Sequence, residues 1–325
     1  MSFVPLREDD GSITGMIACL RNIDEEIRKM NTAYYHLPGL FEFCELYRVF
    51  LPLWREHREY FYDWCSIGSI YGAPADCLWG GGRVGFGSND PREALALTEE
   101  YGISARLTFS NSLLREEHLA DKRCNELCAM FERSGGNGVI LTSELLLDYL
   151  RRTYPGLYLV SSTTKVLTRF EELRQELGRE EFRFVVPDFR LNKAFAELAS
   201  LPEDEKAKVE FLCNECCWFD CFDRKACYEN VSRKSLGEDC PDHVCVSPDA
   251  AEGYRFSKAM ENPGFIGTED ILRRYLPLGF SHFKIEGRSL GSALILEFIL
   301  YYMTRPEHRL RVREEIYLDS MLDLF

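Results

Sequence analysis

The chain has 325 residues, of which 46% are hydrophobic and 28% are charged, and its formal net charge is −14. This composition is typical of a globular protein and excludes the disordered and fibrous classes. The negative charge would repel a phosphate backbone, which argues against broad nucleic-acid binding. The polar start and the shortness of the longest apolar run, residues 293–303, predict a cytoplasmic protein without a membrane span.

The order of the predicted elements indicates a barrel. We expect residues 1–31 to be an N-terminal extension, and from residue 32 strand-like runs alternate with amphipathic helix-like runs. The strand-like runs are residues 32–37, 63–70, 103–109, 137–142, 157–162, 182–187, 208–213 and 281–286. Such alternation is typical of βα units on a parallel sheet. Eight units predict an α/β fold, a single (β/α)8 TIM-type barrel over residues 32–325.

The helix boundaries carry ordinary end signals. One helix is expected after Asp90 as N-cap, with Pro91 at its first position and Gly102 as its stop. A second is predicted over residues 113–132, and a third over residues 267–279 with Thr268 as a possible cap.

The connection after the seventh strand is too long for an ordinary crossover. About 67 residues separate Cys213 from Ser281, and we interpret residues 214–265 as an insertion. Loops that follow the strands of such a barrel gather on its C-terminal face, where active sites lie. The insertion is therefore predicted to cover that face.

The insertion is also rich in cysteine. Seven of the chain's 13 cysteines fall between Cys213 and Cys245. In a reducing compartment such a group indicates metal binding or catalysis better than disulfides. The other cysteines are interpreted as small buried apolar residues: Cys19, Cys44, Cys65, Cys77, Cys124 and Cys128.

The spacing favours an iron–sulfur cluster over zinc. A structural zinc site prefers two C-x2-C pairs, and a radical-SAM loop needs C-x3-C-x2-C; neither is present. A 4Fe–4S cluster accepts irregular spacing from a wrapping loop. Zinc and a metal-free group of thiols remain alternatives. The predicted ligands are Cys216, Cys221, Cys240 and Cys245, with Cys217 and Cys227 as close rivals.

The last strand carries two polar side chains that should point into the barrel. Because side chains alternate along a strand, Phe283 and Ile285 are expected to face the helices, while Lys284 and Glu286 face the interior. This pair could form an internal ion pair or a proton-transfer couple.

Three segments resemble the collagenase-like peptidases of family U32, whose catalytic type is unassigned: "FVVPDFRLN" at residues 184–192, "VEFLCNECCWFDC" at 209–221 and "HFKIEGR" at 282–288. The resemblance implies a barrel with a 4Fe–4S cluster at its mouth in many members. It also implies either peptidase activity or support of oxygen-independent hydroxylation. We predict catalytic roles for Lys284, Glu286, Arg288 and Glu215, and cofactor-binding roles for Asn214 and Arg224.

Three functions follow as hypotheses. The first is a cluster-dependent hydroxylation or related redox modification of a small or RNA-borne ring. The second is a non-catalytic binding or assembly subunit whose barrel mouth docks a protein partner. The third is a peptidase, although the chain has no standard protease motif.

Overall fold

The structure is a computed structural model that describes residues 32–82, 87, 90–253, 255–287 and 290–321. The predicted N-terminal extension, residues 1–31, and the predicted site residue Arg288 lie outside the described residues. The described part contains eight strands: β1 (Ala33–Pro38), β2 (Cys65–Gly72), β3 (Ser104–Phe109), β4 (Gly138–Leu141), β5 (Tyr158–Ser161), β6 (Phe182–Val185), β7 (Glu210–Leu212) and β8 (His282–Lys284). Each strand overlaps one predicted run, which confirms the predicted strand order.

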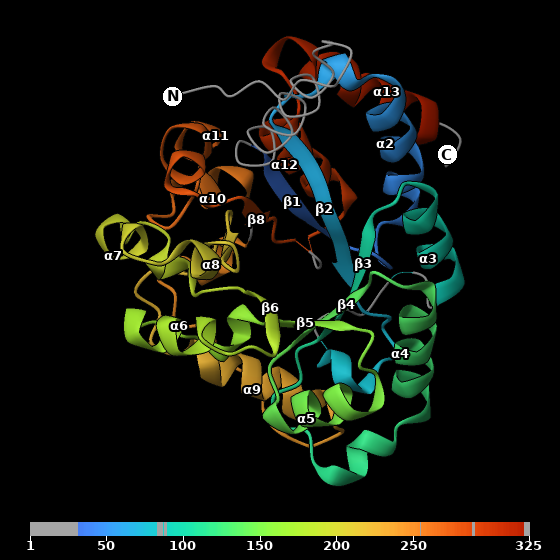
Figure 1. Cartoon of the computed structure of the whole chain (residues 1–325), viewed down its shortest axis with the longest axis vertical. Helices are drawn as coiled ribbons and strands as arrows, with labels where there is room; N and C mark the ends of the chain where they lie inside the picture. The colour runs from blue at the N-terminus through green and yellow to red at the C-terminus, as the bar shows by residue number, and fades with distance from the viewer. Residues whose placement is uncertain (1–31, 83–86, 88–89, 254, 288–289, 322–325) are drawn as a thin grey trace, which may run out of the picture.

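The strands form one parallel sheet in the order β6-β5-β4-β3-β2-β1-β8-β7. The two end strands meet through a parallel bridge between Val185 and Val209, where the amide of Val185 donates to the carbonyl of Lys208 at 2.8 Å. This bridge brings the sheet round on itself, with helices outside the strands (Figure 1). The predicted (β/α)8 barrel is confirmed.

The helices fill the connections between the strands. They are α2 (Cys44–Glu56), α3 (Pro91–Glu100), α4 (Lys122–Ser134), α5 (Glu144–Thr153), α6 (Phe170–Leu177), α7 (Phe195–Ala199), α8 (Glu203–Lys206), α9 (Arg224–Ser235), α10 (Phe256–Glu261), α11 (Thr268–Asp270), α12 (Ser292–Met303) and α13 (Arg309–Met321). Single turns are η1 (Arg58–Tyr60), η2 (Leu78–Gly80), η3 (Glu116–Ala120), η4 (Thr163–Lys165), η5 (Phe189–Leu191), η6 (Ala250–Glu252), η7 (Ile271–Tyr275), η8 (Leu276–Leu278) and η9 (Pro306–His308). No helix of the described residues is long and apolar enough to cross a membrane.

The predicted helix boundaries are confirmed at the start of one helix and differ from the structure in two others. The Asp90 side chain accepts from the amide of Arg92, and α3 begins at Pro91 as predicted. The helix predicted over residues 113–132 starts only at Lys122, because the Asp121 side chain caps it. The helix predicted over residues 267–279 is irregular: Thr268 is its first residue rather than its cap, and it continues as a π-type turn and a 3-10 turn.

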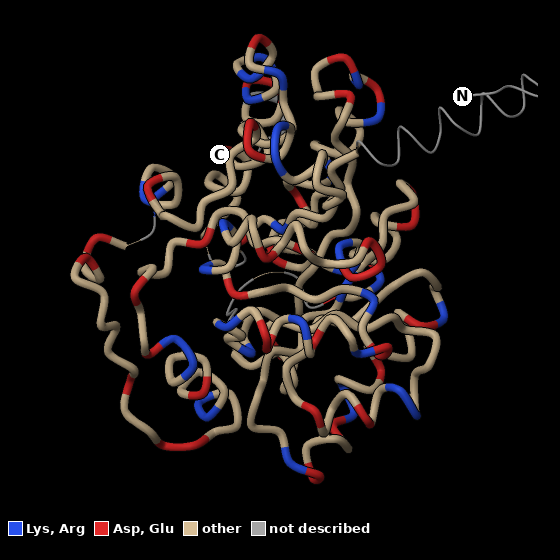
Figure 2. Tube along the Cα trace, turned by 60° about the vertical axis from the view of Figure 1, so that its left-hand side comes forward, with Lys and Arg blue, Asp and Glu red and all other residues tan. Residues whose placement is uncertain are grey.

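The apolar side chains form two clusters, one on each side of the strands. The larger cluster packs the outer faces of the strands against the helices and includes Phe283 and Ile285, which confirms the predicted orientation of these two residues. The smaller one lies on the inner faces and comprises Tyr71, Ile140, Val160, Phe184, Val186 and Leu212. Charged residues of both signs are interspersed along the outer helices and loops (Figure 2).

Candidate functional site

The barrel interior holds a group of buried charges centred on Glu210. Its carboxylate lies 2.5 Å from Nη1 of Arg106 and 3.4 Å from Nζ of Lys284. Nε2 of His36 is 3.5 Å from the same carboxylate and 3.1 Å from Nδ1 of His282. These side chains come from β1, β3, β7 and β8, so the network ties together strands that are far apart in the sequence.

The protonation states in this network follow from burial and charge. Burial alone would raise the pKa of Glu210, but the charges of Arg106 and Lys284 hold that pKa below its usual range. Burial, followed by the charge of Arg106, lowers the pKa of His36 well below its usual value. Burial also lowers the pKa of His282 to about 4. Glu210 is therefore an anion and both histidines are neutral at neutral pH.

Apolar side chains line the inner faces of the strands beside these charges. Leu212, Val160 and Val186 lie two residues beyond Glu210, Tyr158 and Phe184 on the same inner faces of their strands, toward the C-terminal ends. Tyr71 belongs to this cluster, and Nζ of Lys284 lies 3.3 Å from the centre of its ring. The side chains of Glu210 and Arg106 are 0% and 1% exposed, so the network is buried inside the barrel.

The two neutral histidines make stability depend on pH. In the unfolded chain a histidine binds its proton near pH ~6.5, whereas folded His282 does so only at about 4. The unfolded state then binds more protons, so stability is fully present above pH ~6.5 and is lost as the pH falls toward about 4. We expect this loss to be on the order of 3 kcal/mol.

Urea unfolding across this pH range measures the effect. The His282→Asn variant should show a smaller decrease in stability than the wild type. The His57→Asn variant, changed at a partly exposed histidine beside Glu59, should keep the full decrease. Equal pH profiles for the wild type and His282→Asn would contradict this interpretation.

At the barrel mouth, Arg224 is a buried cation between two carboxylates. It is the first residue of α9; its Nη1 lies 2.7 Å from Oδ2 of Asp188, and its Nη2 lies 2.5 Å from Oε2 of Glu215. Burial would lower the pKa of Arg224, but Tyr228, Glu215 and Asp188 raise it well above its usual value. Asp188 follows β6 and Glu215 follows β7, so this charged group joins the ends of two neighbouring strands.

The same group holds the cysteine turn on the mouth. The other oxygen of Glu215 accepts from the amides of Cys216 and Cys217, each at 3.0 Å. Arg190 donates to the carbonyls of Phe219 and Cys221 at 2.8 and 2.6 Å. The turn is therefore anchored at its beginning and at its end.

Two further contacts connect the insertion to the barrel rim. Asn214 and Glu286 exchange two hydrogen bonds: the amide of Glu286 donates to Oδ1 of Asn214 at 2.7 Å, and Nδ2 of Asn214 donates to the carbonyl of Glu286 at 3.2 Å. At the far end of α9, Asn111 donates to the carbonyl of Ser232 at 3.4 Å. Because Asn111 follows β3, α9 reaches from the ends of β6 and β7 across the mouth.

The predicted catalytic residues divide between two levels of the barrel. Glu215 and the half-buried Glu286 lie at the rim with Asn214 and Arg224. Lys284 points inward as predicted, and it contacts the buried Glu210 carboxylate inside the barrel. Arg106, Glu210 and His36 were not predicted as site residues from the sequence. Each of these residues is a charged or histidine side chain at an inward position of a mostly apolar strand, and that pattern could have predicted a buried polar network.

The predicted ligand thiols are not gathered into a ready-made metal site. Cys216 and Cys221 are half-buried in the anchored turn, Cys240 lies near Asn230, and Cys245 is exposed. Within the described ranges, no three Cys, His, Asp or Glu side chains are grouped so that they could hold a metal ion. A 4Fe–4S cluster would therefore require these four thiols to approach one another.

Among the hollows lined by described residues, two lie at opposite ends of the barrel. One of about 440 Å³ opens beside the cysteine turn and is lined in part by Cys221, Arg190, Phe222 and Val166. Val166 has a φ of 57°, which is unusual for a β-branched residue.

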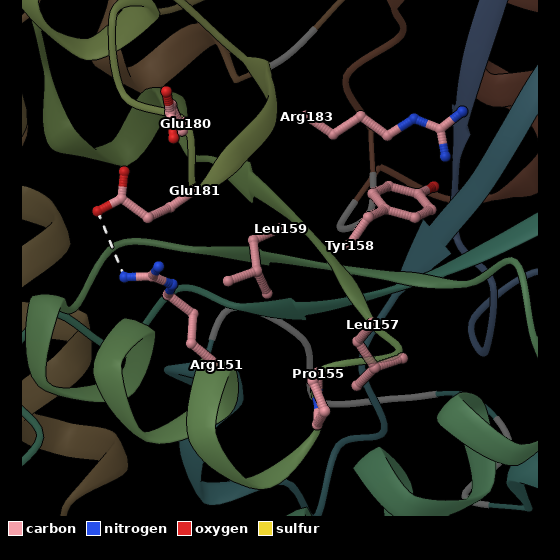
Figure 3. Close-up of a pocket in the computed structure, with 8 residues that line it drawn as sticks. All are labelled: Arg151, Pro155, Leu157, Tyr158, Leu159, Glu180, Glu181 and Arg183. Carbon is pink, nitrogen blue, oxygen red and sulfur yellow. Dashed lines mark ion pairs between the residues drawn. The ribbon is translucent and has the colours of Figure 1, made fainter.

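The other hollow, of about 430 Å³, lies at the N-terminal ends of β5 and β6 (Figure 3). There the guanidinium of Arg183 lies 4.7 Å from the Tyr158 ring centre, and Arg151 pairs with Glu181 at 3.6 Å. Since catalytic groups of such barrels lie at the C-terminal end, the hollow at the mouth is the better candidate.

A solved structure of a U32 peptidase is similar to this chain. The two share 13% sequence identity, the match covers 79% of this chain and 94% of the other, and the TM-score is 0.48. No family model matches the sequence, and no curated protein matches it.

Proposed function

We propose that this protein is a metal-dependent barrel enzyme that works at its C-terminal mouth, beneath the cysteine-rich insertion. The cofactor proposed is a 4Fe–4S cluster, with zinc as the alternative. The proposed reaction is an oxygen-independent hydroxylation or a related redox modification of a small or RNA-borne ring. The observation that carries the proposal is the fixing of the cysteine turn by Arg224, Asp188 and Glu215 at the face where such barrels keep their active sites.

The local structure of the insertion is compatible with closure around a metal. Cys216, Cys217 and Cys221 already lie on one anchored turn. Cys240 and Cys245 lie in residues 238–247, which contain neither helix nor strand. A segment of this kind can order through its ligands. Asn214 and Arg224 would border the bound group.

Metal uptake should release protons and weaken as the pH falls. Burial, followed by the charges of Glu215 and Glu286, raises the pKa of Cys216. Burial and Glu215 raise the pKa of Cys217 to about 12. These thiols are therefore neutral in neutral solution, and a metal must displace their protons to bind them.

Anaerobic titration with ferrous iron and sulfide, and separately with zinc, tests this expectation at several pH values. Replacing Cys216 with serine should lower the affinity for the metal at least about tenfold. A loss of this size is typical even when the mutated residue only hydrogen-bonds to a metal ligand. The matched control is Cys65→Ser, at a buried cysteine that donates to the carbonyl of Tyr62. Equal uptake by Cys216→Ser and the wild type would overturn the ligand assignment.

A non-catalytic assembly subunit is the second candidate. Phe222 and Val244 of the insertion expose 83% and 80% of their surface. Large exposed apolar side chains at a barrel mouth are suited to docking another protein. A chain that takes up no metal but forms a stable complex weakened by Phe222→Ser would favour this candidate over the enzyme.

A further inference from the structure

A second group of thiols lies away from the insertion, beneath the loop that follows β2. Sγ of Cys77 and Sγ of Cys124 are 3.3 Å apart, although 47 positions separate them in the sequence. Both cysteines are free and buried. Neither is among the thiols proposed as metal ligands, so this pair is independent of the proposed function.

The surrounding structure holds the two sulfur atoms together. Cys77 precedes η2, and Cys124 lies in the first turn of α4, where its amide donates to the Asp121 cap at 2.8 Å. The amide of Trp79 also points at Sγ of Cys124, at 3.5 Å. A disulfide bond is about 2.0 Å long, so the sulfur atoms need to approach by only about 1.3 Å.

We propose that Cys77 and Cys124 are a dithiol modification site that small peroxides oxidise to a reversible disulfide. Cys77 reacts first, since its exposed fraction is 5% and that of Cys124 is 0%. Its sulfur attacks a peroxide oxygen and the O–O bond breaks, giving a sulfenic acid and, with hydrogen peroxide, one water. The Cys124 sulfur then attacks the Cys77 sulfur, the S–O bond breaks, and the thiol proton leaves with the hydroxyl as a second water. The thiols lose two electrons and the peroxide accepts them.

The chemistry of the pair predicts a slow reaction. The hydrogen bond with Cys77, followed by burial, raises the pKa of Cys124. The Cys124 thiol is therefore protonated at neutral pH, and because the thiolate is the reactive form, its attack on the sulfenic acid should be slow. Cys128, one turn further along α4, is also buried.

The link would fix the loop after β2 to α4, directly under the end of α9. The hydroxyl of Ser235, the last residue of α9, donates to the carbonyl of Leu78 at 3.5 Å. Oxidation of Cys77 would thus stiffen the surface on which the cysteine-rich insertion rests. We therefore expect the oxidised protein to have a higher midpoint of thermal unfolding, since the link constrains the unfolded chain.

Mass spectrometry tests the proposal. The native protein is treated with hydrogen peroxide, then denatured in the presence of an alkylating agent and digested without reduction. The expected product is a peptide pair joined through Cys77 and Cys124 that lacks the mass of two hydrogen atoms and separates on reduction. Cys44 and Cys65, which are buried beside backbone carbonyls, should remain reduced and serve as internal controls.

Variants separate this site from other oxidations. The link and the rise in the thermal midpoint should be absent in Cys77→Ser and retained in Cys128→Ser. The proposal is overturned if Cys77 and Cys124 are both recovered reduced after Cys245 has been oxidised. It is also overturned if the link forms only in denaturant.

Discussion

The Glu210→Gln variant is expected to lower the free energy of unfolding by about 3–5 kcal/mol, the range found when one partner of a buried ion pair is removed. The amide would leave Arg106 and Lys284 inside the barrel without the carboxylate that now lies 2.5 Å and 3.4 Å from them. Urea unfolding followed by circular dichroism measures the change, because the lost interaction joins strands of the barrel itself.

A surface pair gives the matched control for this prediction. Glu45 lies 2.6 Å from Arg48, but 71% of its side chain is exposed. Glu45→Gln should therefore change the stability by less than about 1 kcal/mol. If Glu210→Gln proves as mild as Glu45→Gln, the buried network does not support the barrel as described.

The Arg224→Met variant should release the insertion while the barrel stays folded. The substitution leaves the carboxylates of Asp188 and Glu215 without the guanidinium between them. Loss of a buried partner of this kind costs about 3 kcal/mol. Because the charged group anchors the cysteine turn, we expect proteolysis between Cys221 and Cys245 to become up to about a hundred-fold faster.

The neighbouring Lys225 provides the control. It is exposed and lines the hollow beside the cysteine turn. Lys225→Met also removes one positive charge from the first turn of α9, but the rate of cleavage between Cys221 and Cys245 should remain close to that of the wild type. Equal digestion of the two variants would show that Arg224 does not hold the insertion.

The barrel could be predicted from the sequence because each strand carries its own local signal. Runs such as residues 137–142 and 157–162 are short, apolar and separated by amphipathic helices, and the structure has β4 and β5 at these places. Helix boundaries were less predictable where a single side chain decides them. Asp121 starts α4 nine residues later than the hydrophobic pattern indicated.

Contacts between distant residues were beyond the sequence pattern. Alternation along β8 indicated that Lys284 points inward, but not that Glu210 and Arg106 meet it from β7 and β3. Likewise, the cysteine count indicated a metal-binding or catalytic insertion, yet no local pattern indicated that Cys77 lies against Cys124. Such partners are set by barrel closure and by helix packing, which a local pattern does not contain.

The central claim is that the insertion at the barrel mouth binds a metal through its thiols. The most direct test is to isolate the full chain without oxygen and to measure iron, acid-labile sulfide and zinc per chain. We expect about four iron and four sulfide per chain, bound in a form that protects the segment between Cys221 and Cys245 from proteolysis. A finding of one zinc per chain in place of iron and sulfide would show that zinc, the alternative cofactor, is the bound metal. A fully folded protein with no bound metal, digested identically with and without a chelator, would contradict the claim.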